Sequence, residues 1–328
     1  MIWFWLGFFA LVALLLFLDL GVLHRKAAEP SLKSAAGWTV AWVCLGLAFA
    51  GVVYLIYEHA WLGARMHKPG DGSDAAITYV AAYLLEQALS VDNIFVMSLL
   101  FRSFRVPAKY QHRVLFWGIL GAVIFRITML GGGAYIANRF SWVFYIFGAY
   151  LAWQGAKLFR AEDDDGDDRE QSLAVRALRR FVRIVDGDHG GKFTVQIDGR
   201  RALTTVAVCL VVIELTDIVF ALDSIPAVLS VSQDTFIIVT SNIFAILGLR
   251  SLYFVLAGAM AKFDQLKYAL AVLLILIGAK LVLHDVDAVR ELPHVYSLAA
   301  IAGIIGTGVI ASVIANRRRA AEAPPPPT

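Results

Sequence analysis

Nine long apolar stretches run through this chain of 328 residues, and they restrict its possible folds more than any other feature. They lie near residues 3–23, 36–57, 76–101, 114–133, 141–159, 203–225, 236–260, 267–284 and 295–315. A helix needs roughly 20 apolar residues to cross the hydrocarbon core of a bilayer. Since 59% of the residues are hydrophobic and only 17% are charged, lipid is the expected solvent. We predict an all-α, polytopic membrane protein of about nine transmembrane helices.

The positive charges between the apolar stretches favour one orientation in the membrane. If the N-terminus lies outside, the inner loops contain most of the lysines and arginines. The outer loops then keep only those at positions 65, 68, 139 and 290. Cytoplasmic loops of membrane proteins are enriched in Lys and Arg. We therefore predict a multi-pass protein of the inner (plasma) membrane with its N-terminus outside and its C-terminus in the cytoplasm.

Two parts of the chain share three short signatures in the same order. Both 86–94 and 217–225 read acid, five residues, Asp, a small polar residue, Ile. Ile-Leu-Gly follows at 119–121 and 246–248, and Gly-Ala-Lys-Leu at 155–158 and 278–281. These matches indicate an internal repeat of three helices.

The predicted topology inverts the second repeat relative to the first, because the third stretch runs inward and the sixth runs outward. Secondary transporters share this architecture, with substrate sites near the midplane between the repeats. Five regions follow: two N-terminal helices at 1–75, the first repeat at 76–159, a cytoplasmic loop at 160–201, the second repeat at 202–285, and a last transmembrane helix with a disordered cytoplasmic tail at 286–328. Within the loop, alternating residues and an Asp-Gly dipeptide at 193–200 predict a small hairpin.

Five carboxylates lie inside two of the apolar stretches. Each charge in a bilayer costs about 2.5–3.5 kcal/mol on insertion scales, so protonation, pairing or a bound cation must offset it. The acids and three nearby polar residues offer only oxygen ligands, which suit Mg²⁺, Mn²⁺ or Ca²⁺. The candidate metal-site residues are Glu86, Asp92, Asn93, Glu214, Asp217, Asp223, Ser224 and Asn242.

The six-residue spacing of the paired acids leaves two local structures open. On an unbroken helix, the two acids of a pair point about 120° apart. Either each acid faces a different groove, or the helix is locally unwound. Pro226 favours unwinding in the sixth stretch, because it leaves the carbonyl of Leu222 without its helical donor.

The number of acids also predicts that protons take part in transport of the ion. Five negative charges exceed those that one divalent cation neutralises, so we expect some acids to be protonated and the ion to exchange for protons. Arg126 and Arg250 lie in neighbouring apolar stretches, and we favour pairing with the acids over snorkelling to the interface. Acids locked onto these two arginines, with no cavity between the third and sixth stretches, would count against transport.

The two acidic stretches resemble the signatures of the TerC/Alx integral membrane family. The matching residues are Glu86, Leu89, Ser90, Asp92 and Asn93, and then Glu214, Asp217 and Phe220 with Ala221 and the run from Asp223 to Ala227. The resemblance extends over nearly the whole chain. It implies a role in tellurium resistance or, for the Alx branch, in manganese export, with Glu86, Asp92, Glu214, Asp217 and Asp223 along the metal path.

These inferences lead to an exporter of divalent cations, most specifically Mn²⁺, rather than an enzyme. The expected partners are the cation, protons and the lipid bilayer, with no nucleic acid and no permanently bound cofactor; the oligomeric state stays open. A Ca²⁺ or Mg²⁺ transporter is one alternative, and a tellurite-resistance or membrane-assembly protein without flux is another. An intramembrane aspartyl protease is disfavoured, because no Gly-x-Gly-Asp sequence accompanies the aspartates.

Overall fold

The computed structural model describes residues 2–18, 32–61, 70–140, 142–160, 182–185, 187, 189–197, 200–257, 266–283, 285–286, 289 and 293–322. Every predicted apolar stretch contains a helix in these residues. The helices are α1 (Ile2–Phe17), α2 (Leu32–Glu58), α3 (Gly72–Ser103), α4 (Ala108–Arg139), α5 (Val143–Arg160), α7 (Thr205–Val231), α8 (Thr235–Leu247), α9 (Leu249–Ala257), α10 (Leu266–Val282) and α12 (His294–Glu322).

Five of the described helices, α2, α3, α4, α7 and α12, are long and apolar enough to cross a membrane. Helices α8 and α9 pass the same test together and make a sixth span if they cross as one, although they are bent by 45° at Gly248. The chain is thus an all-α, polytopic membrane protein with five or six candidate spans in its described part. The count of about nine crossings, the orientation and the inverted repeat stay predictions.

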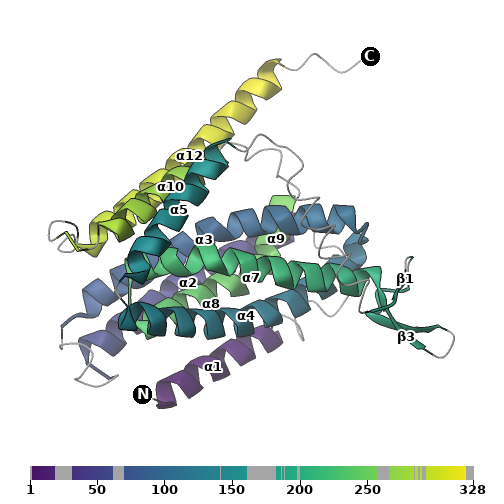
Figure 1. The fold of residues 1–328 in the computed structure, drawn as a ribbon, viewed down its shortest axis with the longest axis horizontal. Helices are drawn as coiled ribbons and strands as arrows, with labels where there is room; N and C mark the ends of the chain where they lie inside the picture. Colours follow the sequence, from purple (N-terminus) through teal and green to yellow (C-terminus); the bar gives the residue numbers. More distant parts are fainter. Residues whose placement is uncertain are drawn as a thin grey trace.

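The helices form a main bundle with a smaller group beside it (Figure 1). In the bundle, α3 and α4 both contact α7 and α8, and α2 contacts α3. Helix α8 is buried on all sides, as expected for a helix at the centre of a membrane bundle. The smaller group contains α5, α10 and α12, and it joins the bundle through contacts of α12 with α3 and of α5 and α10 with α7.

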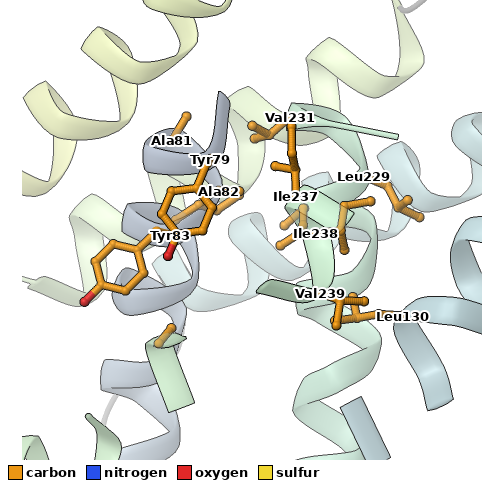
Figure 2. Close-up of a cluster of buried hydrophobic side chains, with 14 of the residues drawn as sticks. Tyr79, Ala81, Ala82, Tyr83, Leu130, Leu229, Val231, Ile237, Ile238 and Val239 are labelled. Atoms are coloured by element: carbon orange, nitrogen blue, oxygen red, sulfur yellow. The ribbon is translucent and has the colours of Figure 1, made fainter. Parts of the chain in front are cut away.

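The largest apolar core draws its buried side chains mainly from α2, α3, α7, α8 and α10. Figure 2 shows Tyr79 and Tyr83 of α3 in this cluster, together with Ile237 and Ile238 of α8. The outer faces carry large exposed apolar side chains instead, such as Ile124, which is 59% exposed. Water-soluble proteins rarely expose contiguous apolar surface of this kind, so lipid is its natural solvent.

A three-stranded sheet precedes α7, in the order β1 (Ile184–Val185), β3 (Arg200–Thr204) and β2 (Thr194–Ile197). Strands β2 and β3 are antiparallel, so the predicted hairpin is confirmed, and β1 adds a short parallel edge. Strand β3 continues directly into α7. Its last residue, Thr204, also caps that helix, because the Thr204 hydroxyl accepts a hydrogen bond from the backbone N–H of Ala207 at 3.3 Å.

The sheet rests on the start of α4. Arg113 donates to the carbonyl of Gly191 at 3.1 Å, and its guanidinium lies 4.7 Å from the centre of the Phe193 ring. The Tyr110 ring covers Gly191 from the same helix. The predicted cytoplasmic loop contains an acidic run at 162–168, and the predicted tail ends in a Pro-rich segment at 324–328; both lie outside the described residues.

Candidate functional site

The centre of the candidate site is an ion-pair cluster in which one arginine contacts acids of two other helices. Arg126 of α4 forms a salt bridge through Nη1 with Oε1 of Glu86 on α3. Its other terminal nitrogen, Nη2, lies 3.6 Å from Oδ1 of Asp217 on α7. Glu86 and Asp217 begin the two matching sequence signatures, so the structure brings their carboxylates to the same guanidinium.

Helix α8 adds the fourth member of this cluster. Arg126 Nη1 also donates to the side-chain oxygen of Asn242 at 3.3 Å, and the Asn242 amide in turn donates to the carbonyl of Ile238 at 3.1 Å. We call Glu86, Arg126, Asp217 and Asn242 the buried cluster. None of the four is more than 5% exposed, so their charges interact with little screening by water.

Helical periodicity explains why polar residues extend from the cluster along two helices. On α3, Glu86, Ser90 and Asn93 are spaced by four and three residues, share one face, and are all buried. On α7, Ser224 follows Asp217 by seven residues and is buried on the same face. The Ser224 hydroxyl donates to the carbonyl of Ala221 in its own helix.

Glu214 lies one turn before Asp217 on α7 and packs against the backbone of α4. A Cβ atom added to Gly121 would overlap the Glu214 carboxylate, so only glycine permits this approach. Glu214 is three residues from Asp217 and therefore shares its helix face. The structure thus gathers Glu86, Asp217 and Glu214 around the contacts of α4 with α3 and α7.

Several oxygens at this site lack a hydrogen-bond partner among the described residues. They are Oε2 of Glu86, Oδ2 of Asp217, Oε2 of Glu214 and the hydroxyl of Ser90, all buried. The Nε atom of Arg126 is unpartnered as well. Buried polar atoms are nearly always hydrogen-bonded in native proteins, so these atoms hold hydrogen-bonding capacity that the described residues do not use.

A sequence model of the integral membrane protein TerC family matches residues 71–320, which contain every residue of the site. The chain belongs to the TerC family.

Curated relatives of this TerC protein align over nearly their whole length. The chain is 42% identical to the membrane protein STKORF319 of Myxococcus xanthus, over 95% of this chain and 92% of that protein. It is 39% identical to Alx of Photorhabdus laumondii, over 97% of each chain, and 38% identical to Alx of Escherichia coli K12, over 96% and 95%. The name of both Alx proteins describes them as proposed membrane-bound redox modulators. No solved structure matches the chain.

The predicted site residues of the TerC protein fall into three groups. Glu86, Asp217 and Asn242 meet at Arg126, with Glu214 beside them. Asn93 and Ser224 lie further along the same helix faces. Asp92 and Asp223 have backbones in α3 and α7, but their side chains lie outside what the structure describes.

Two expectations about local structure have clear outcomes. Pairing of Arg126 with the acids is confirmed, whereas the pairing of Arg250, which is buried in α9, stays a prediction. Unwinding of the sixth stretch at Pro226 is wrong, because α7 remains helical from Thr205 to Val231. Membrane helices tolerate an internal proline, since neighbouring helices and side chains support the backbone groups that it frees.

The pairing with Arg126 also bears on the metal-site prediction for this TerC protein. In the described part of the chain, no three His, Cys, Asp or Glu side chains gather closely enough to hold a metal ion. Metal ligation by the predicted residues therefore stays a prediction.

Sequence reasoning missed two contributors to the site. Ser90 stands inside the first signature, four residues after Glu86, and that helical spacing is a signal that would have found it. Gly121 was noted only as part of a repeated Ile-Leu-Gly triplet. Its contact with Glu214 depends on how α4 packs against α7, which no local pattern encodes.

Proposed function

We propose that this TerC protein transports a divalent cation across the inner membrane, with the cation bound by the carboxylates of α3 and α7. The observation that carries the proposal is the charge of the site. Glu86, Asp217 and Glu214 supply three negative charges and Arg126 supplies one positive charge, which leaves two negative charges when all three acids are ionised. One divalent cation neutralises this excess, and the unpartnered oxygens offer it ligands.

An inverted repeat would provide the alternating access that transport requires, and the packing of α5 on α10 supports it. Aligning Gly155 with Gly278 also aligns Gly148 with Ala271. Under this alignment, the pair Gly148 and Gly278 corresponds to the pair Ala271 and Gly155. Both pairs are in close contact, as an inverted repeat predicts. The main bundle has the same correspondence, because α4 contacts α7 while α8 contacts α3.

Manganese is the ion that we propose, and export from the cytoplasm is the direction. The oxygen ligands suit Mn²⁺, Mg²⁺ and Ca²⁺ equally, so the choice among the three comes from the family resemblance. Exchange with protons follows from the excess of acids, since carboxylates that lose the ion are stabilised in the bilayer by protonation.

Flux measured in liposomes tests this function directly. The full-length protein is reconstituted, and Mn²⁺, Mg²⁺ and Ca²⁺ are presented one at a time with and without a proton gradient. We expect Mn²⁺ flux that the gradient accelerates. Asp217→Asn removes one charged ligand and should lower the flux about tenfold or more. Asp74→Asn, at an exposed acid of α3, serves as the control and should transport like the parent.

The other outcomes of this experiment identify the alternatives. Flux of Ca²⁺ or Mg²⁺ in place of Mn²⁺ would reassign the substrate. A folded protein without flux of any divalent cation would leave a tellurite-resistance, membrane-assembly or redox role. If Asp217→Asn transports as fast as the parent protein, the ion does not pass through the buried cluster.

A further inference from the structure

Arg126 occupies a position that a transported cation would need. Its guanidinium lies between the carboxylates of Glu86 and Asp217, which come from α3 and α7. An arginine side chain stays positively charged in proteins at any physiological pH. The protein therefore carries its own cation at the point where the acids of α3 and α7 converge.

The pairing is weaker than that expected of a purely structural ion pair. A buried ion pair is stabilising only when further hydrogen bonds satisfy the remaining polar atoms. Here Glu86 Oε2, Asp217 Oδ2 and Arg126 Nε have no partner among the described residues. The 3.6 Å between Arg126 and Asp217 also exceeds the usual length of a hydrogen bond. The guanidinium thus neutralises negative charge of the two acids but leaves several polar atoms of the cluster without a hydrogen bond.

We propose that Arg126 is an internal counter-cation that competes with the transported ion for the carboxylates of α3 and α7. The proposal rests on the proposed function and adds a mechanism for releasing the ion. When the divalent cation binds, the guanidinium leaves at least one acid. When the guanidinium returns, it displaces the cation. Arg126 in this way weakens binding and speeds release, which makes it a positioning residue rather than a ligand.

Arg126→Gln, measured in the same liposome assay, tests the competition. Without its competitor the ion should bind more tightly, so the KM for Mn²⁺ should fall about tenfold, as expected for loss of one charge-assisted contact. The kcat should fall too, because nothing displaces the bound ion. Arg126→Lys keeps the charge and should stay near the parental KM. Arg139→Gln makes the same change at an exposed arginine of α4 and should leave both constants unchanged.

A second comparison covers the case in which Arg126→Gln fails to fold, since two acids would lose their partner. Glu86→Gln and the double variant Glu86→Gln/Arg126→Gln carry the same acids and differ only in the arginine. The KM of the double variant should be the lower of the two. Size-exclusion profiles and thermal unfolding confirm that each variant is folded.

The outcomes separate this inference from the function on which it rests. If the parent moves no divalent cation, both fall together. If the parent transports Mn²⁺ and folded variants without Arg126 show an unchanged or higher KM, only the counter-cation role is overturned. Loss of flux in proportion to lost folded protein, without any change in KM, would identify Arg126 as a packing residue and would overturn it equally.

Discussion

Gly121 shows how one missing side chain positions an acid of the site. The Glu214 carboxylate lies against the α4 backbone at this residue, in space that any Cβ atom would fill. At Gly131, further along α4, an added Cβ atom would meet no other atom within 4 Å. The two glycines therefore make a matched pair in one helix.

We expect Gly121→Ala to destabilise the protein and Gly131→Ala to leave it near the parent. The added methyl group at position 121 must displace the Glu214 carboxylate, which ends a flexible side chain, so we expect a cost of about 1 kcal/mol, at the low end for overpacking. Thermal unfolding in detergent measures the stability, and Mn²⁺ flux reports on the displaced acid. Equal stability and flux in the two variants would mean that Glu214 does not lie against α4.

Sequence alone identified the acids of the site but not their arrangement. Glu86 and Asp217 stand out because carboxylates are costly in apolar sequence. The sequence predicts that Arg126 pairs with acids, but which acids meet there depends on how the helices pack. Asp92 and Asp223 were identified by the same argument, and their ligand role stays a prediction.

Among the elements, α5 and α10 cross at very close range. A Cβ atom at Gly148 would lie 2.7 Å from the carbonyl oxygen of Gly278, and one at Gly278 would lie 2.6 Å from that of Gly148. Association of membrane helices is driven by close packing, and small residues at the interface permit it.

Gly148→Ala should therefore separate the two helices and lower stability by about 1–3 kcal/mol. Gly306→Ala in α12, where nothing lies within 4 Å, is the control. Thermal unfolding of both variants in the same detergent measures the effect. A destabilisation in the control as large as that in Gly148→Ala would contradict this account of the crossing.

The contact of the sheet with α4 depends on Gly191. Both Gly190 and Gly191 have left-handed backbones, with φ of 66° and 70°, so alanine strains them equally. Only at Gly191 does the new Cβ atom meet another residue, the Tyr110 ring at 2.5 Å. We expect Gly191→Ala to expose the sheet to limited proteolysis faster than Gly190→Ala does. Equal cleavage rates would show that the Tyr110 contact does not hold the sheet on α4.

Sequence patterns predicted where these elements lie better than they predicted bends or breaks within a helix. Apolar length located every helix of the described residues, and alternation with Asp-Gly located the hairpin. The bend at Gly248 was not predicted, because a glycine in an apolar run reads the same whether the helix bends or continues. The opposite error occurred at Pro226, where tertiary support keeps α7 helical.

For the whole molecule, the arrangement in the membrane is open to a direct test. The distribution of Lys and Arg predicts a C-terminus in the cytoplasm and an N-terminus outside. A green fluorescent protein fused to the C-terminus should fluoresce, whereas alkaline phosphatase at the same position should be inactive. The opposite pair of results would reverse the predicted orientation and the assignment of the sheet to the cytoplasm.

The family was predictable at this scale because its signatures are long and specific, and it is confirmed by the match over residues 71–320. The number of crossings was less accessible. Helices α5 and α10 have 18 and 17 residues, close to the shortest length that spans a bilayer, so apolar length does not decide whether they cross.

The absence of any linker between β3 and α7 has a mechanical consequence. Thr204 ends the strand, donates to the carbonyl of Lys192 and caps the helix, so strand and helix turn as one rod. Asp217 lies about 18 Å along that rod from the first residue of α7. A displacement of the sheet therefore acts directly on the start of α7, and that helix carries the displacement toward Asp217.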